Sequence, residues 1–292
     1  IAEREEIEFL HPHPTVEARE IALRRELFES RGIEVYLPRP EVIGPDKATI
    51  NKKLTSWGVP TPETVVVNSL EDVDAAFHRL GSPLWLRAKT GAGGRLSLKV
   101  SSPEEAKLWI RLNILQGRAN VDHFILQEYL PGRDIAFDSL WYRGTLITSY
   151  ARERLEYPFK HISLSGITGT PSVARVIVDP KVNEVGIEAV RALDENPHGF
   201  YSVDLREDSS GVPMVTEVDA KWHTTAPLWG YAFSFLFKNP SYNLAYQYVR
   251  LGYGEEPESL PKVNLFPEGY TMIRQMDCGV ILLGSGTTVR VV

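Results

Sequence analysis

Cysteine is almost absent from this sequence, since Cys278 is the only one among 292 residues. An intrachain disulfide and a cysteine-rich zinc site are therefore excluded, and a reducing compartment fits better than secretion. No stretch approaches the roughly 20 apolar residues of a membrane span, and no signal peptide is visible. We therefore expect a cytoplasmic protein that does not contact a membrane.

An excess of positive charge is also lacking. The 32 Lys and Arg residues face 38 Asp and Glu, a formal charge of -6. Because no dense basic run could follow a phosphate backbone, we expect no nucleic-acid partner. The motifs G-x-x-x-x-G-K-[ST], G-x-G-x-x-G, H-E-x-x-H and G-x-S-x-G are all missing. This removes the best evidence for a Walker-type phosphate loop, the usual dinucleotide turn, a zinc protease and a hydrolase elbow.

The composition, 43% apolar and 24% charged, is typical of a folded protein. The length exceeds what one compact core usually holds, so we expect two or three lobes sharing a cleft, where ligands commonly bind. The chain opens at Ile1 on an acidic run, and we expect a fragment or a chain that lacks an N-terminal portion.

Hydrophobic spacing and turn residues predict an alternation of helices and short strands, followed by longer strands. Ahead of this pattern we expect a helix at 15–31 and a strand at 33–37. The first lobe has predicted helices at 47–57, 70–80 and 103–115, and predicted strands at 64–67, 84–88, 97–100 and 124–128. Beyond it we expect strands at 135–142 and 145–152, a loop at 157–172, a helix at 180–193, a hairpin at 199–221, a helical stretch up to 252, and a terminal pair of strands within 270–292 that turns at 284–286.

A glycine-rich loop, residues 90–95, lies between two predicted strands. Glycines in such a loop can present backbone N–H groups to a polyphosphate, and Arg87 and Lys89 just before it would add cationic partners. A flexible hairpin tip with solvated charges explains these residues equally well.

The hairpin at 199–221 carries acidic residues on one face. With a loop at 208–211, Asp204 lies opposite Val215 and diagonal to Glu217, at the roughly 7–8 Å of a diagonal pair. Asp219 shares the face of Glu217, so three carboxylates converge. Their mutual repulsion, about 3 kcal/mol per pair at 5 Å, calls for a cation, and oxygen ligands favour Mg2+ or Mn2+. The alternative is a solvated polar face of a sheet.

Lone histidines are more often surface or capping residues than ligands. We therefore interpret His11 and His13 as structural or incidental, and give little weight to a substrate role for His161 or His223.

In order and spacing, four segments resemble the ATP-grasp superfamily, especially the branch of the carbamoyl phosphate synthetase large chain and biotin carboxylase. They are an entry helix after Asp46-Lys47 with its exit at 57–62, the strand 84–87 with the glycine loop, the interlobe segment 126–134, and the paired strands 203–205 and 216–221. The resemblance covers roughly residues 46–222.

This resemblance implies an α/β (α+β) ATP-grasp fold whose two lobes hold MgATP between them. It divides the chain into a remnant of an N-terminal α/β domain (1–45), a small lobe (46–128) and a large lobe with the metal site (129–292). The implied activity transfers the γ-phosphate of ATP to a carboxylate, and an amine or other nucleophile then attacks the acylphosphate. Its partners would be small-molecule substrates, within a homo-oligomer or a larger synthetase.

The resemblance also implies roles for individual residues. Phosphate would be bound by Lys47, Arg87 and the flap glycines Gly91, Gly93 and Gly94; adenine by Gln127, Glu128 and Leu130; ribose by Asp134; Mg2+ (or Mn2+) by Asp204, Glu217 and Asp219; and the transferring phosphoryl group by Lys221 and Arg87.

Three positions depart from the family pattern: Asp219 replaces the usual Asn, Lys221 the usual Arg, and Leu96 a frequent Gly. These departures keep two alternatives open. One is an ATP-grasp scaffold that binds nucleotide without catalysis, and the other is an unrelated α/β enzyme that uses the carboxylates for metal-assisted hydrolysis.

Overall fold

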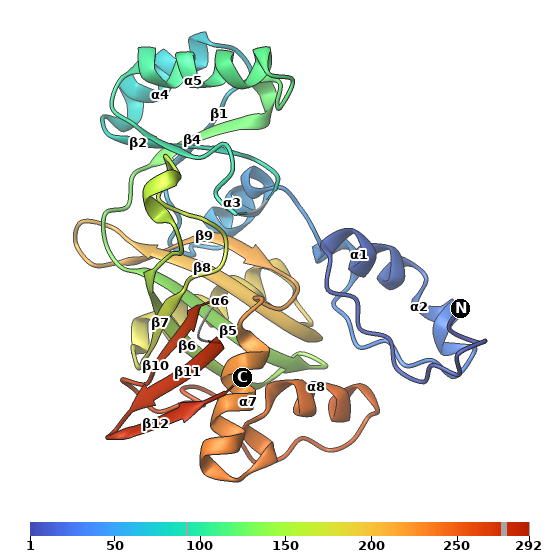
Figure 1. The fold of residues 1–292 in the computed structure, drawn as a ribbon. Helices are drawn as coiled ribbons and strands as arrows, with labels where there is room; N and C mark the ends of the chain where they lie inside the picture. Colours follow the sequence, from blue (N-terminus) through green and yellow to red (C-terminus); the bar gives the residue numbers. More distant parts are fainter. Residues whose placement is uncertain (92, 276–278, 292) are drawn as a thin grey trace.

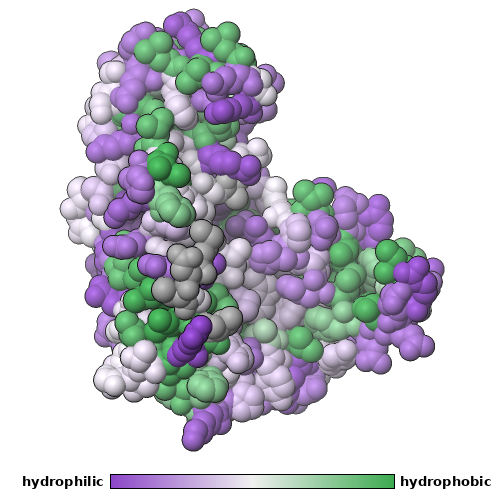
Figure 2. Space-filling model, in the orientation of Figure 1, coloured by the Kyte–Doolittle hydropathy of each residue, from purple (hydrophilic) through white to green (hydrophobic). Residues whose placement is uncertain are grey.

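The computed structural model describes residues 1–91, 93–275 and 279–291. Ala92 of the glycine loop and the single cysteine, Cys278, lie outside the described residues. An N-terminal segment projects to one side of a small upper lobe and a larger lower lobe (Figure 1, and the space-filling view in Figure 2). None of the helices in these ranges has the length and apolar character that crossing a membrane requires.

The N-terminal segment differs from the sequence prediction in two places. The predicted helix at 15–31 is two helices, α1 (Thr15–Leu23) and α2 (Arg25–Glu29), because the backbone of Arg24 leaves the helical region at φ -114° and ψ 21°. The predicted strand at 33–37 does not form, and only an isolated bridge joins Phe9 to Glu34. This stretch is instead buried against the large lobe, where the Tyr36 hydroxyl donates to the carbonyl of Trp141. The short helix η1 (Pro40–Val42) follows.

The small lobe is a four-stranded antiparallel sheet in the order β1-β4-β2-β3, with its helices on one face (Figure 1). The Ser102 side chain caps helix α5 (Pro103–Leu115) by accepting from the amide of Glu105. The lobe has its own core, and its elements confirm the predictions. They are β1 (Thr64–Val66), α4 (Glu71–Leu80), β2 (Leu84–Ala88), β3 (Leu98–Val100), α5 (Pro103–Leu115), η2 (Val121–His123) and β4 (Phe124–Glu128).

The entry helix α3 (Lys47–Ser56) confirms another prediction. Asp46 caps it by accepting from the amides of Ala48 and Thr49. The helix packs on the edge of the large lobe, where Ile50 and Leu54 join the core. The first turn of α3, which carries Lys47, therefore sits at the boundary between the lobes.

The large lobe is built on an eight-stranded sheet in the order β12-β11-β10-β7-β6-β5-β8-β9. Helix α6 joins a core on one face, and α7 and α8 join a second core on the other. The elements are β5 (Asp134–Tyr142), β6 (Thr145–Glu156), η3 (Lys160–Ile162), β7 (Val173–Ile177), α6 (Pro180–Leu193), β8 (Gly199–Glu207), β9 (Pro213–Asp219), α7 (Ala226–Phe237), η4 (Pro240–Tyr242), α8 (Leu244–Gly252), β10 (Thr271–Gln275), β11 (Gly279–Gly284) and β12 (Thr287–Arg290).

Two parts of the large lobe were not predicted correctly. Strand β7 lies between the predicted loop and the predicted helix, where no strand was expected. The C-terminal region has three strands instead of a pair, although β11 and β12 do turn at Ser285 and Gly286. The added strand, β10, pairs with both β7 and β11 and so connects this region to the rest of the sheet.

The register of the β8–β9 hairpin also differs from the prediction. Asp204 lies directly opposite Glu217, and Leu205 lies opposite Val215, so Thr216 is an extra residue on β9. The Thr216 hydroxyl donates to the carbonyl of Asp204 across this bulge. The expected diagonal pair is therefore a direct pair, which brings the two carboxylates closer along the sheet.

Candidate active site

A cavity of about 570 Å³ lies between the two lobes. It is lined by the start of α3, strand β2 and the glycine loop on one side, and by β5, β6, β8, β9 and the 157–172 loop on the other. Every residue to which the family resemblance assigns a role lines it: Lys47, Arg87, Gly91, Gly93, Gly94, Gln127, Glu128, Leu130, Asp134, Asp204, Glu217, Asp219 and Lys221. Lys89, expected as a further cationic partner of the glycine loop, is not among the lining residues.

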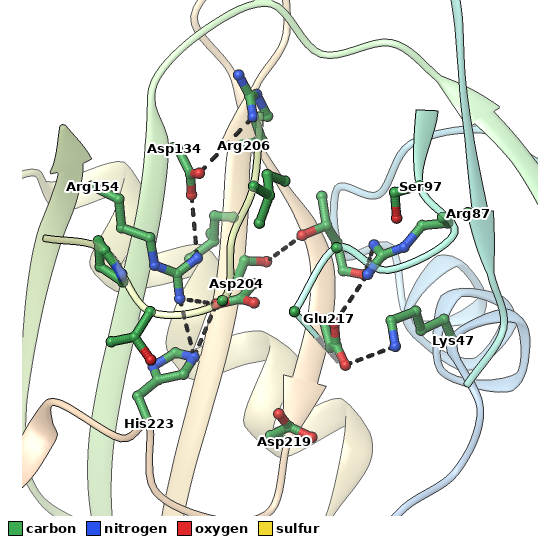
Figure 3. Close-up of a pocket in the computed structure, with 18 of the residues that line it drawn as sticks. Lys47, Arg87, Ser97, Asp134, Arg154, Asp204, Arg206, Glu217, Asp219 and His223 are labelled. Atoms are coloured by element: carbon green, nitrogen blue, oxygen red, sulfur yellow. Dashed lines mark hydrogen bonds and ion pairs between the residues drawn. The ribbon is translucent and has the colours of Figure 1, made fainter. Parts of the chain in front are cut away.

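Two cations from different elements converge on one carboxylate in this cavity. The Lys47 ammonium lies 3.0 Å from Glu217 Oε1, and the Arg87 guanidinium lies 3.1 Å from Glu217 Oε2 (Figure 3). Lys47 also donates to the carbonyl of Gly91 at 2.8 Å, and its side chain is only 6% exposed. The capped start of α3 and the middle of β2 thus hold two positive charges at the base of the glycine loop.

The glycine loop leans onto the large lobe. Gly91, Gly93 and Gly94 all have positive φ angles, as does Leu96 at 66°. A Cβ atom added to Gly94 would lie 2.9 Å from the Cβ of Ile167, so only glycine permits this approach. Gly93 likewise comes close to Gly169. The loop and the 157–172 segment therefore meet over the cavity.

Two aromatic rings, one from β2 and one from the interlobe segment, line the cavity and were not predicted from the sequence. The rings of Trp85 and Tyr129 both line it, with centroids 6.5 Å apart. Gln127 has a buried side chain whose amide donates to Thr64 at 2.9 Å, so it faces the small-lobe sheet. Asp134 accepts from the Tyr157 hydroxyl at 2.9 Å and faces the large lobe.

Glu217 and Asp219 stand two residues apart on β9 and line the same cavity. Burial, together with the negative charge of Glu217, raises the pKa of Asp219 to about 6, although Lys221 opposes the shift. A hard cation such as Mg2+ would neutralise the excess negative charge of Glu217 and Asp219. Within the described ranges no group of three His, Cys, Asp or Glu side chains is arranged to hold a metal ion. One or two carboxylates suffice for Mg2+ that keeps water and phosphate oxygens.

Asp204 is part of a buried network of charges. Its Oδ1 lies 2.5 Å from the Arg154 guanidinium and 2.9 Å from His223 Nε2 (Figure 3). The second ring nitrogen of His223 lies 2.8 Å from Asp138, which in turn pairs with Arg152. Burial opposes ionisation of Asp204, but the charges of Arg154 and His223 hold its pKa well below the usual range. Burial likewise opposes protonation of His223, while Asp138 and Asp204 raise its pKa overall.

Several residues of this network went unpredicted. Arg152 and Arg154 alternate along β6, which was the available signal. Arg152 pairs with Asp138 on the adjacent hairpin strand β5, whereas Arg154 pairs with Asp204 on β8, which is distant in sequence. His223, given little weight from the sequence, proves to bridge two carboxylates. His13, interpreted as structural, lines the cavity, whereas His161 is not among the lining residues.

Comparison with known proteins agrees with this geometry, although no family model matches the sequence. The glutamate–LysW ligase ArgX of Sulfurisphaera tokodaii is 30% identical over 177 residues, which cover 60% of this chain and 59% of that ligase. The chain thus aligns with somewhat less than two thirds of the length of this curated relative.

Solved structures match over more of the chain. The biotin carboxylase domain of Hydrogenobacter thermophilus 2-oxoglutarate carboxylase, solved with MgADP, ADP and bicarbonate, has a TM-score of 0.70 and 18% identity over 94% of this chain and 59% of its own. The carboxyaminoimidazole ribonucleotide synthase of Aspergillus clavatus, solved with ATP, has a TM-score of 0.62 and 16% identity over 87% and 62%. The chain therefore has the ATP-grasp fold of these structures.

The ATP-grasp fold expected from the sequence is thereby confirmed, including its mixed α/β class. It explains why two sheets face one cavity, because the lobes of this fold grasp their ligand between them. The roles of the individual residues remain predictions, which the contacts above make specific.

Proposed function

We propose that this ATP-grasp chain is an ATP- and Mg2+-dependent ligase that activates a carboxylate as an acylphosphate and transfers the acyl group to an amine. The observation that carries the proposal is the convergence of Lys47 and Arg87 on Glu217 beside the glycine loop. Phosphoryl transfer needs positioning and charge neutralisation more than a covalent residue. A cavity that gathers cations, backbone N–H groups and acidic metal ligands supplies both.

Each group then has a distinct task. Lys47, Arg87 and the flap glycines bind the phosphates of ATP, while Glu217 and Asp219 hold Mg2+, with Asp204 beside them in its ion pairs. Bound Mg2+ would neutralise charge on the phosphate oxygens. A carboxylate oxygen attacks the γ-phosphorus, and the bond to the β-phosphate oxygen breaks to release ADP. Lys221, 3.9 Å from Asp219, is placed to stabilise the transferring phosphoryl group.

The name of the relative from Sulfurisphaera tokodaii suggests the substrates to try first. Because that protein is a glutamate–LysW ligase, we propose a small carboxylate or amine of the glutamate type. The small-molecule substrates and the cytoplasmic location expected from the sequence belong to the same proposal, in which the oligomeric state is left open.

Calorimetric titration of MgATP tests the nucleotide site. We expect the parent chain to bind in a Mg2+-dependent way, and Glu217→Gln/Asp219→Asn to bind at least tenfold more weakly because the metal loses both ligands. In a turnover assay, L-glutamate and other small carboxylates should stimulate ADP release, which the double variant should reduce about 10²- to 10³-fold. Glu153→Gln is the matched control, because Glu153 pairs with Arg175 and is not a cavity residue.

The outcomes also separate the alternatives. Binding without carboxylate-dependent ADP release would favour the non-catalytic scaffold. Metal-dependent hydrolysis that needs no nucleotide would favour the unrelated hydrolase. Absence of binding by the parent chain would contradict the proposal.

A further inference from the structure

His13 reaches the cavity from the N-terminal segment, outside both lobes. The neighbouring His11 anchors this segment, with its Nδ1 3.2 Å from the Tyr248 hydroxyl. That hydroxyl donates its single proton to the carbonyl of Tyr36, so it accepts from His11 Nδ1–H. The His11 ring also packs edge-on against Trp222, at 6.1 Å between centroids. Residues 11–13 are therefore held against the part of the cavity wall that contains Trp222.

The other groups around the acceptor side of the cavity are already engaged. A base needs a free lone pair, yet both ring nitrogens of His223 contact carboxylates. The carboxylates that the large lobe contributes to the cavity are engaged as well, with Asp134 on Arg154 and Tyr157, Asp204 on Arg154 and His223, Glu217 on Lys47 and Arg87, and Asp219 3.9 Å from Lys221 and assigned to Mg2+. The cavity carboxylate of the small lobe, Glu128, belongs to the segment assigned to adenine.

His13 differs from these large-lobe groups. Among the described residues, nothing forms a hydrogen bond or an ion pair with its ring. Two titratable groups act electrostatically beside it, Lys221 from the segment after β9 and His11 from its own segment. Partial burial, and after it the charge of Lys221, lower the pKa of His13, which favours the neutral imidazole.

We propose that His13 is the general base that takes the proton from the amine attacking the acylphosphate. This inference rests on the proposed ligase function. The amine nitrogen attacks the acyl carbon, and as the N–C bond forms, the proton on nitrogen passes to the His13 imidazole. The bond between the acyl carbon and the phosphate oxygen breaks, and inorganic phosphate leaves with the electron pair. Because His13 keeps contact with solvent, the proton then passes to water.

The placement beside Lys221 suits this step. Lys221 is the cation assigned to the transferring phosphoryl group, and its charge acts directly on His13. The base is therefore close to the cation assigned to the transferring phosphoryl group, and it belongs to a segment separate from the two lobes.

The test compares two nucleophiles on the same acylphosphate. Parent, His13→Ala and His13→Gln chains are supplied with MgATP, L-glutamate or whichever carboxylate releases ADP, and either methylamine or hydroxylamine. Hydroxylamine is a strong nucleophile that is largely neutral at pH 7, so hydroxamate formation should stay within about twofold of the parent. Amide formation from methylamine should fall about 10²-fold, and added imidazole should restore part of it in His13→Ala.

His78→Gln on the exposed side of α4 is the matched control, and thermal unfolding verifies that each variant is folded. With rates expressed per concentration of free methylamine, the ratio of amide formation in the parent to that in either His13 variant should fall as the pH is lowered, because only the parent loses a base on protonation of His13. Equal losses of amide and hydroxamate, or unchanged amide formation, would overturn the inference while leaving the ligase proposal intact. A parent chain without carboxylate-dependent ADP release would contradict the ligase proposal itself, and the inference would fall with it.

Discussion

At the residue scale, His198 shows how burial among cations makes stability depend on pH. Its Nδ1 accepts from the amide of Arg143 at 3.2 Å, and its ring packs edge-on against Tyr36. Burial first, and then the positive charges of Arg25 and Arg143, lower the pKa of His198 to about 4. His198 is therefore protonated near pH 6.5 in the unfolded chain, but only near pH 4 in the folded chain.

Stability from this group is fully present above pH 6.5 and is lost as the pH falls toward 4. Between pH 7 and 4.5, the free energy of unfolding of the parent should fall by about 2 kcal/mol more than that of a His198→Gln chain, which lacks the titrating group. Denaturant unfolding at both pH values measures this difference. His78→Gln, on an exposed face, should follow the parent, and an identical pH slope in the His198 variant would contradict the assignment.

The residues that bind or position ligand were only partly predictable at this scale. Alternation along two strands placed Asp204, Glu217 and Asp219 on one face, and that depends only on strand geometry. No pattern in the sequence indicates the bulge at Thr216, so the predicted register of the β8–β9 hairpin was wrong. The pairing of Arg154 with Asp204 depends on β6 and β8 lying on either side of β5, and short-range spacing does not predict that strand order.

At the element scale, the glycine loop forms a lid that packs against the 157–172 segment. This contact is possible because residue 94 has no side chain. Gly94 has a φ angle of 68°, and an added Cβ would lie 2.9 Å from Ile167 Cβ and 3.1 Å from its carbonyl oxygen. We therefore expect Gly94→Ala to hold the lid open and raise the KM for ATP about tenfold, with little change in the unfolding midpoint. Gly117→Ala, which also has positive φ but open space around it, controls for backbone strain. Equal KM values in the two variants would contradict the lid contact.

Elements with strong local signals were predicted well. Helices α3 and α5 begin at side chains that accept from their own first-turn amides, and these caps are visible in the sequence as Asp46 and Ser102. Strand β7 was missed because it sits between a polar loop and a helix and is defined by its neighbours β6 and β10. The stretch at 33–37 is apolar enough for a strand, but burial against the large lobe takes the place of sheet pairing.

At the scale of the whole molecule, the two lobes are joined across the cavity by charge. Arg87 belongs to the small-lobe sheet and Glu217 to the large-lobe sheet, and their ion pair spans the cleft. Arg87 also donates to the carbonyl of Thr216 at 3.4 Å. These contacts join the lobes at the centre of the cleft, and the phosphates of the proposed nucleotide would compete for the same guanidinium.

Removing this cation should therefore change the shape of the molecule before any chemistry is measured. We expect Arg87→Met to let the lobes separate, so that small-angle scattering without nucleotide gives a larger radius of gyration than the parent. High salt should expand the parent toward the same value, because screening weakens a partly exposed ion pair. Arg79→Met removes an ion pair with Glu63 that stays within the region of the small lobe and should leave the radius unchanged. If Arg87→Met has the dimensions of the parent at low and high salt, the flap contacts alone hold the lobes together.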